Sequence, residues 1–80
     1  MDTSKVGIVS DCPLQRHVLA HALRGYGFGI WINCDPARLT DAVLRQADQA
    51  DAWVVDLADE EQWSDAIDRL IEATEAPVLF

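Results

Sequence analysis

Two aspartates, Asp11 and Asp56, stand at or just beyond the ends of short apolar runs in the sequence. Carboxylate oxygens are the ligands that a hard divalent cation such as Mg²⁺ prefers, and the cation keeps several of its water molecules. A carboxylate beside such a cation can also attack a phosphoryl group, because the metal neutralises the developing charge. The pair is therefore a candidate site for weak Mg²⁺ binding, with Asp56 as the candidate phosphoryl acceptor. A purely structural interpretation stays open, in which Asp11 caps a helix and Asp56 ends a strand.

The elements that must position these residues alternate between strand and helix along the chain. Apolar runs at 5–10, 28–32, 52–57 and 77–80 predict four strands. The first run has no polar alternation, which is typical of a strand buried on both faces of a parallel sheet.

Three helices are predicted between the strands. Pro13 and Pro36 mark the starts of the first two, because proline at the first helical position gives up no hydrogen bond. The second of these helices is expected to run from 36 to about 47. Apolar positions recur with helical spacing in all three helices and are expected to face the core: Leu14, Val18, Leu19, Ala22 and Leu23; Leu39, Val43 and Ala47; Trp63, Ile67, Leu70, Ile71 and Thr74.

This alternation with short links favours parallel strands joined by right-handed crossovers. The sequence therefore predicts one α/β domain over residues 1–80, with an open parallel sheet of flavodoxin-like type and strand order 2-1-3-4. In that order the strands at 5–10 and 52–57 are neighbours, and function gathers at the carboxyl ends of such strands. Asp11 and Asp56 should meet there.

The charge balance narrows the range of partners. Fourteen acidic residues stand against six basic ones, which gives a formal net charge of -8. Such a surface repels phosphate backbones and anionic lipids, so neither nucleic acid nor a membrane is expected as a partner. No signal peptide is evident, and Cys12 and Cys34 are interpreted as reduced thiols, so we expect a cytoplasmic protein. A basic protein surface or a divalent cation fits this charge, and solubility alone would also explain it.

Other candidate sites are weaker. His17 and His21 have an i, i+4 spacing that can bind zinc, but no third ligand is evident and a solvated helix face is the simpler interpretation. The glycine-rich stretch at 25–29 follows a helix, whereas a dinucleotide fingerprint must precede one. Cys12 stands at a helix N-terminus, where a thiol can be activated, yet an idle thiol is commoner. No nucleophile–base pair can be placed, so the chain is not expected to be an enzyme.

Three segments resemble the receiver domain of bacterial response regulators. The run Val9–Arg16 is similar to the opening of a receiver, where an acidic pair precedes a small residue, a proline and a helix. Ala52–Leu57 resembles the third receiver strand, whose terminal aspartate accepts a phosphoryl group, and Pro77–Phe80 resembles the fourth. The closest likeness is to the N-terminal receiver-like segment of chemotaxis-type protein-glutamate methylesterases of type IV pilus (twitching) signalling.

The resemblance implies a module of two-component signalling that acts by protein–protein contact. Its partners would be a histidine kinase or the protein's own effector domain, with Asp56 as the phosphoryl acceptor and Mg²⁺ held by Asp11 and Asp56. A methylesterase domain, if one exists, would lie downstream of these residues.

Departures from the receiver pattern imply a degenerate or truncated receiver, with impaired phosphorylation. Ser10 stands where the first acidic residue of the pair is expected, and the acidic loop at 58–61 lacks the usual Met-Pro. The hydroxyl residue and the lysine that follow later receiver strands lie beyond the sequence. The alternative is a structural or oligomerisation domain with a vestigial pocket.

The end of the sequence suggests a further interface. Pro77, Val78, Leu79 and Phe80 form a short apolar terminal strand, and exposed apolar edges invite pairing with another chain. The sequence therefore predicts an excised N-terminal segment of a longer protein or a domain that forms a homodimer.

Overall fold

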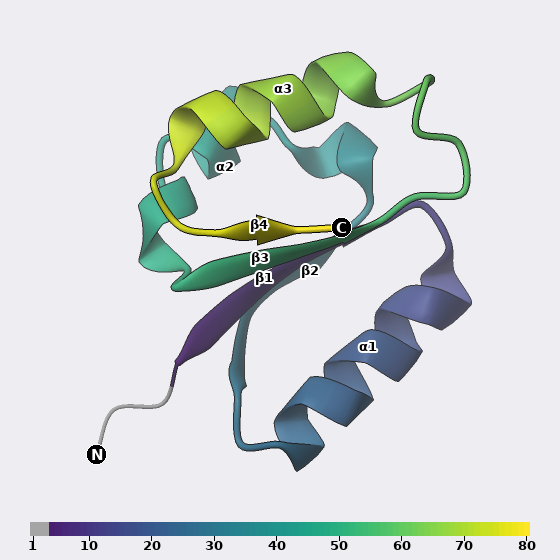
Figure 1. The fold of residues 1–80 in the computed structure, drawn as a ribbon, viewed down its shortest axis with the longest axis vertical. Coiled ribbons are helices and arrows are strands. Elements are labelled where there is room, and N and C mark those ends of the chain that lie inside the picture. Colours follow the sequence, from purple (N-terminus) through teal and green to yellow (C-terminus); the bar gives the residue numbers. More distant parts are fainter. Residues whose placement is uncertain (1–3) are drawn as a thin grey trace.

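The computed structural model describes residues 4–80, in which strands and helices alternate (Figure 1). The elements are β1 (Lys5–Ser10), α1 (Pro13–Gly25), β2 (Gly29–Cys34), the 3₁₀ helix η1 (Pro36–Arg38), α2 (Asp41–Leu44), the 3₁₀ helix η2 (Ala47–Gln49), β3 (Ala52–Asp56), α3 (Ser64–Ala73) and β4 (Val78–Leu79).

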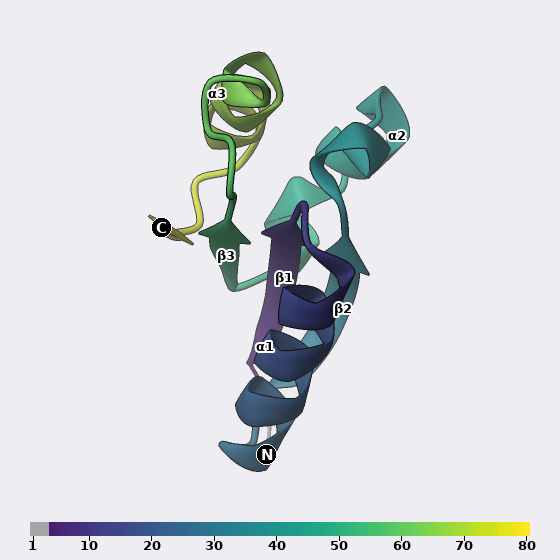
Figure 2. The same cartoon turned by 90° about the vertical axis from the view of Figure 1, so that its right-hand side faces the viewer.

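The four strands form one sheet in the order β2-β1-β3-β4, and every neighbouring pair is parallel. This confirms the predicted α/β class and strand order, those of a flavodoxin-like open sheet. Helix α1 covers one face of the sheet, while α2 and α3 lie over the other (Figures 1 and 2). Because the strands are parallel, all their carboxyl ends lie at one edge of the sheet.

Each face of the sheet has its own apolar core. The larger core lies under α2 and α3 and is formed by buried side chains from β1, β2, α2, η2, β3, α3 and the links between them: Val9, Cys34, Leu39, Leu44, Ala47, Ala50, Trp53, Val55, Ile67 and Leu70. The smaller core, under α1, is made of Val6, Ile8 and Ala20 with partly buried neighbours. Successive side chains of β1 and β3 point alternately into the two cores, as the two-residue period of a strand requires.

Trp53 is the centre of the larger core. Its side chain is fully buried, and its indole Nε1 donates a hydrogen bond to the carbonyl oxygen of Ala47 at 3.1 Å. Trp31 meets it edge to face, with ring centroids 5.8 Å apart. On the neighbouring strand, a Cβ added to Gly7 would lie 2.5 Å from Cε3 of the indole. Glycine at position 7 therefore makes room for this ring.

The predicted inner face of α1 is wrong in part. Leu14 is 70% exposed and Val18 49% exposed, whereas Ala20 is buried and Leu19 and Leu23 are half-buried against the sheet. The helix packs mainly on β1 and β2. Its apolar stripe is wider than that contact, and the small Ala20 side chain lets the helix lie close to the sheet, so one side of the stripe stays in solvent.

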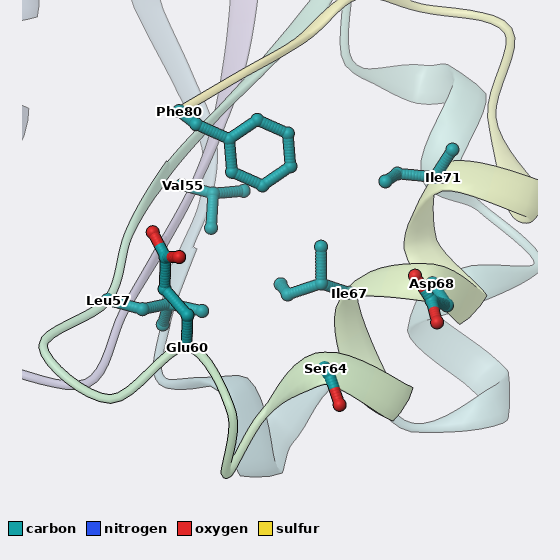
Figure 3. A pocket seen from close by; sticks show the side chains of 8 residues that line it. All are labelled: Val55, Leu57, Glu60, Ser64, Ile67, Asp68, Ile71 and Phe80. Carbon is teal, nitrogen blue, oxygen red and sulfur yellow. The ribbon is translucent and has the colours of Figure 1, made fainter.

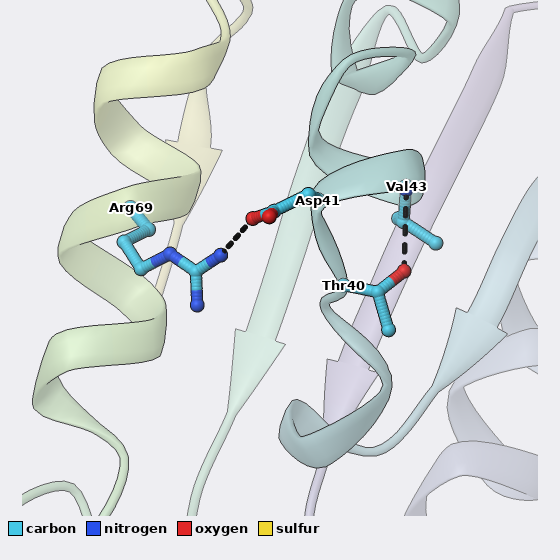
Figure 4. A network of polar contacts seen from close by, with 4 residues as sticks. All are labelled: Thr40, Asp41, Val43 and Arg69. Carbon is cyan, nitrogen blue, oxygen red and sulfur yellow. Dashed lines mark hydrogen bonds and ion pairs between the residues drawn. The ribbon is translucent and has the colours of Figure 1, made fainter.

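The single helix predicted for residues 36–47 is also wrong. The chain forms three short pieces instead, η1, α2 and η2. The Thr40 hydroxyl accepts a hydrogen bond from the amide of Val43 at 3.4 Å and so starts a new helix at Asp41 (Figure 4). A threonine side chain that caps in this way competes with a continuous helix. The Arg69 guanidinium then pairs with the Asp41 carboxylate and joins α3 to α2 (Figure 4).

Strand ends differ from the prediction by one or two residues. The second strand begins at Gly29 and continues to Cys34, and the fourth is confined to Val78–Leu79. The predicted end of α1 is confirmed, since the helix stops at Gly25 and Gly27 has a positive φ of 92°. Only glycine adopts that conformation at little cost.

Candidate functional site

The structure places Asp11 and Asp56 at the same edge of the sheet. Asp56 is the last residue of β3 and is paired in register with Ser10, the last residue of β1, and Asp11 follows directly. Both aspartates are partly exposed. The sequence rule that parallel strands gather their carboxyl ends therefore correctly located the two side chains.

The Asp11 carboxylate forms hydrogen bonds with the loop between β3 and α3. The amide of Ala58 donates to both of its carboxylate oxygens at 3.1 Å, and the amide of Asp59 donates to Oδ2 at 3.3 Å. The helix-capping alternative for Asp11 is wrong, because the N-cap of α1 is Cys12 and the Asp11 carboxylate accepts from the β3–α3 loop instead. The Asp11 carboxylate thus connects the β1 end of the site to the β3–α3 loop.

Asp56 has a neighbour that the sequence did not suggest. The Gln15 side chain, on the first turn of α1, donates from Nε2 to Oδ2 of Asp56 at 3.2 Å. Gln15 is exposed, so its amide can leave without opening the core. A cation or phosphoryl group at Asp56 Oδ2 would replace this contact.

Ser10 has a structural role beside the two aspartates. The residue is fully buried, and its hydroxyl accepts from the amide of Cys12 at 3.2 Å and lies 3.4 Å from the Cys12 carbonyl oxygen. The Arg16 guanidinium donates to the Ser10 carbonyl oxygen at 2.9 Å. These contacts shape the turn from β1 into α1. An unpaired carboxylate at this depth would be costly, whereas the serine hydroxyl is satisfied by the backbone of Cys12.

The metal-binding capacity of the edge is small. Among residues 4–80 no group of three or more histidine, cysteine or acidic side chains is arranged to hold a metal ion. Two carboxylates can still hold a hydrated Mg²⁺, which usually binds through one or two protein carboxylates. His17 and His21 are both exposed on α1 and belong to no such group. Weak Mg²⁺ binding at Asp11 and Asp56 stays a prediction.

A polar hollow of about 540 Å³ opens at the carboxyl end of β2. Its walls include Arg16, Cys34, Asp35 and Arg38. Burial raises the pKa of the Cys34 thiol, and the charge of Asp35 raises it further, while the two arginines partly offset this. Cys34 is therefore a protonated thiol at neutral pH. Asp35 is the N-cap residue of η1 but makes no capping bond, and its Oδ1 is buried without a partner in residues 4–80.

An apolar groove of about 390 Å³ lies between α3 and the β3–β4 side of the sheet. Phe80 faces Ile67 and Ile71 across it, and the carboxylates of Glu60 and Asp68 stand at its rim (Figure 3). Sequence reasoning missed this groove. Its signal was present in Ile71, an apolar residue at the side of the helix stripe, which the prediction assigned to the core.

The predicted interface segment, residues 77–80, lies beside this groove, and its last residue lines it. Pro77 accepts a hydrogen bond from the amide of Trp53 at 2.8 Å, and Val78 packs against the larger core. Leu79 and Phe80 are 57% and 74% exposed. Their role in an interface stays a prediction.

No helix within the described part of the chain, residues 4–80, has the length and apolar character needed to cross a membrane. Comparison of the chain with models of known protein families, with curated proteins and with solved structures finds no match.

Proposed function

We propose that this chain is a receiver-like regulatory domain of bacterial chemotaxis or twitching-motility two-component signalling, with a cytoplasmic location and without enzymatic activity of its own. The observation that carries the proposal is the pair Asp11 and Asp56 at the carboxyl ends of the neighbouring parallel strands β1 and β3. Flavodoxin-like sheets bind their ligands at this edge, where the strand order reverses. The resemblance of Val9–Arg16 and Ala52–Leu57 to receiver segments supports the same assignment.

The contacts around the two aspartates suggest how a signal would leave the site. A cation or phosphoryl group at Asp56 displaces Gln15 and attracts or repels the Asp11 carboxylate, which holds the amides of Ala58 and Asp59. A change at Asp11 therefore alters the loop that leads into α3. A histidine kinase or an effector domain would then recognise the changed surface formed by this loop and α3.

Stable phosphorylation is not expected at this site. Ser10 replaces a carboxylate that would help to hold the metal, and its hydroxyl is engaged by the backbone of Cys12. Asp59, Glu60 and Glu61 add negative charge in the adjoining loop, which opposes a further phosphoryl charge. Regulation by cation occupancy or by contact with a charged partner is therefore proposed in place of a long-lived phosphoaspartate.

The proposal is tested by Mg²⁺ titration followed through tryptophan fluorescence, since Trp53 lies on the strand that ends at Asp56. The expected result is a saturable change at millimolar Mg²⁺ that is lost in Asp56→Asn and kept in the distant control Asp51→Asn. The same proteins treated with acetyl phosphate should show little phosphoryl adduct by intact mass. An unchanged fluorescence signal in the wild type and in Asp56→Asn alike would refute cation occupancy of the site.

One observation favours a second candidate function, a structural or oligomerisation domain with a vestigial pocket. Backbone amides donate to the Asp11 carboxylate and the Gln15 side chain donates to Asp56, so both carboxylates have hydrogen-bond partners without a ligand. In that case Asp56→Asn should change neither folding nor the fluorescence response to Mg²⁺, whereas the signalling proposal expects that response to be lost.

A further inference from the structure

The charges of this chain are separated between two parts of the fold. Residues 12–34, which include α1 and β2, contain two arginines and two histidines but no acidic residue. Residues 56–75, which include the β3–α3 loop and α3, contain eight acidic residues and one arginine. The two helices lie on opposite faces of the sheet (Figure 2). One side of the molecule is therefore weakly basic and the opposite side strongly acidic.

The basic side carries an exposed apolar ridge. Leu14 and Val18 are 70% and 49% exposed, and His17 and His21 are exposed beside them. These four residues, hereafter the α1 ridge, have the spacing i, i+3, i+4 and i+7 that places side chains on one helix face. Their face points away from the sheet, because Leu19, Ala20 and Leu23 occupy the inner side.

The acidic side carries a matching depression. The groove between α3 and the sheet is lined by apolar side chains, among them Ile67, Ile71 and Phe80, and is bordered by Glu60 and Asp68 (Figure 3). An apolar helix ridge flanked by basic residues is the shape and charge that such a groove accepts. Both halves of this contact are on the same chain, on opposite faces.

We propose that the chain associates head to tail, with the α1 ridge of one copy seated in the α3 groove of the next. The Leu14 and Val18 side chains enter the groove, and His17, His21 and Arg24 lie near the Glu60 and Asp68 carboxylates. Because two different surfaces meet, each copy keeps one free ridge and one free groove, and the assembly can extend beyond a dimer.

Charge favours this arrangement over a two-fold dimer through β4. Pairing two β4 edges would bring together two α3 helices, each with the acidic residues Asp65, Asp68 and Glu72. Like charges on facing surfaces oppose association, and salt would relieve that repulsion. The head-to-tail contact joins opposite charges, so salt would weaken it. The two arrangements therefore respond to salt in opposite directions.

The contact is expected to be weak. Helix α1 has 13 residues and is about 20 Å long, so its outer face gives an interface below the standard size. Association should be sought up to about 1 mM protein, the dissociation constant of a weak complex. This inference does not depend on the signalling role proposed above.

The experiment is sedimentation velocity on the full chain at about 20 mM and about 500 mM NaCl, the range over which screening becomes strong. The weight-average mass should rise from the 8.9 kDa of one chain with increasing protein concentration, and the rise should be smaller at high salt. The ridge variant is Val18→Glu and the groove variant is Ile71→Lys, both at exposed positions. Leu79→Glu, at an exposed β4 residue outside the groove, is the control for edge pairing. Circular dichroism checks that all three are folded.

Each single variant should remain a monomer, whereas Leu79→Glu should associate as the wild type does. Ridge and groove variants mixed together should form a complex that stops at two chains, because each supplies the surface that the other lacks. A wild type that stays monomeric at about 1 mM would overturn the proposal. So would association that salt strengthens, or that Leu79→Glu abolishes, since both results indicate the two-fold arrangement.

Discussion

Both oxygens of the Asp11 carboxylate accept a hydrogen bond from the backbone amide of Ala58, each with an N–O distance of 3.1 Å. The contact joins the end of β1 to the loop that follows β3. The two residues are 47 positions apart in the sequence. This bond makes the β3–α3 loop depend on a side chain that the sequence marks as a candidate ligand. A change of charge near Asp11 should therefore alter the hydrogen bonds that hold this loop.

Removal of the Asp11 carboxylate should destabilise the fold. Asp11→Ala leaves the amides of Ala58 and Asp59 without their acceptor and should lower the free energy of unfolding by about 1–2 kcal/mol. Asp11→Asn keeps one oxygen acceptor and should lose about half as much. Urea denaturation measures the difference, with Glu72→Gln as a control that removes one exposed negative charge. Equal stability of Asp11→Ala and Glu72→Gln would refute the loop-fastening role.

Position 7 should not tolerate a side chain, because Gly7 lies directly against the Trp53 indole. Because an added Cβ would lie 2.5 Å from the ring, Gly7→Ala must displace the ring and should cost about 1–3 kcal/mol of unfolding free energy. The near-ultraviolet circular dichroism of the tryptophans should change with it. Gly25→Ala is the matched control, since a Cβ there meets no neighbouring atom within 4 Å. A fully native spectrum for Gly7→Ala would contradict the packing.

Asp48 should contribute stability that depends on pH. The Thr74 hydroxyl, at 2.6 Å, and the amide of Glu75 donate hydrogen bonds to its Oδ1 and lower the pKa of the Asp48 carboxyl below its usual 3.8. The folded pKa is thus below the unfolded one, so this contribution is present above about pH 4 and is lost as the pH falls through the folded pKa.

Substitution of Thr74 tests how much its hydroxyl, as distinct from the Glu75 amide, lowers the pKa of the Asp48 carboxyl. Thr74→Val removes the hydroxyl at nearly constant volume and should raise the Asp48 pKa toward 3.8, whereas Thr74→Ser should leave it lowered. Carboxyl chemical shifts followed by NMR between about pH 2 and pH 6 give the pKa directly. An Asp48 pKa that is the same in all three proteins would show that the hydroxyl has no effect.

The two cysteines should react with alkylating reagents at very different rates. Cys34 is buried and its pKa is raised, so at neutral pH it has little of the reactive thiolate. Cys12 is partly exposed. Iodoacetamide treatment of the native protein, followed by peptide mass mapping, should label Cys12 well before Cys34. Comparable rates in the native state, together with comparable rates in urea, would contradict the burial of Cys34.

The sequence was sufficient to predict the sheet, because alternating apolar runs and helix-starting prolines leave few topologies for a chain of this size. It also placed Asp11 and Asp56 at one edge, which follows from parallel strands alone. It could not show the rotation of α1, since Leu14, Val18, Leu19 and Leu23 are equally apolar and only the shape of the sheet selects among them.

The sequence also did not indicate which groups form hydrogen bonds with Asp11 and Asp56. Gln15 reaches Asp56 only because of how α1 lies on the sheet, and the Ala58 amide has no side-chain signal at all. The break at Thr40 depends on a local hydroxyl–amide bond that competes with an otherwise helical pattern.

The most direct test of the proposed signalling role is an NMR titration of ¹⁵N-labelled protein with Mg²⁺. Occupancy of the edge between Asp11 and Asp56 should shift the amide resonances of Ala58 and Asp59, and Asp56→Asn should abolish these shifts. Shifts confined to other acidic surfaces, or shifts at Ala58 and Asp59 that persist in Asp56→Asn, would contradict the account.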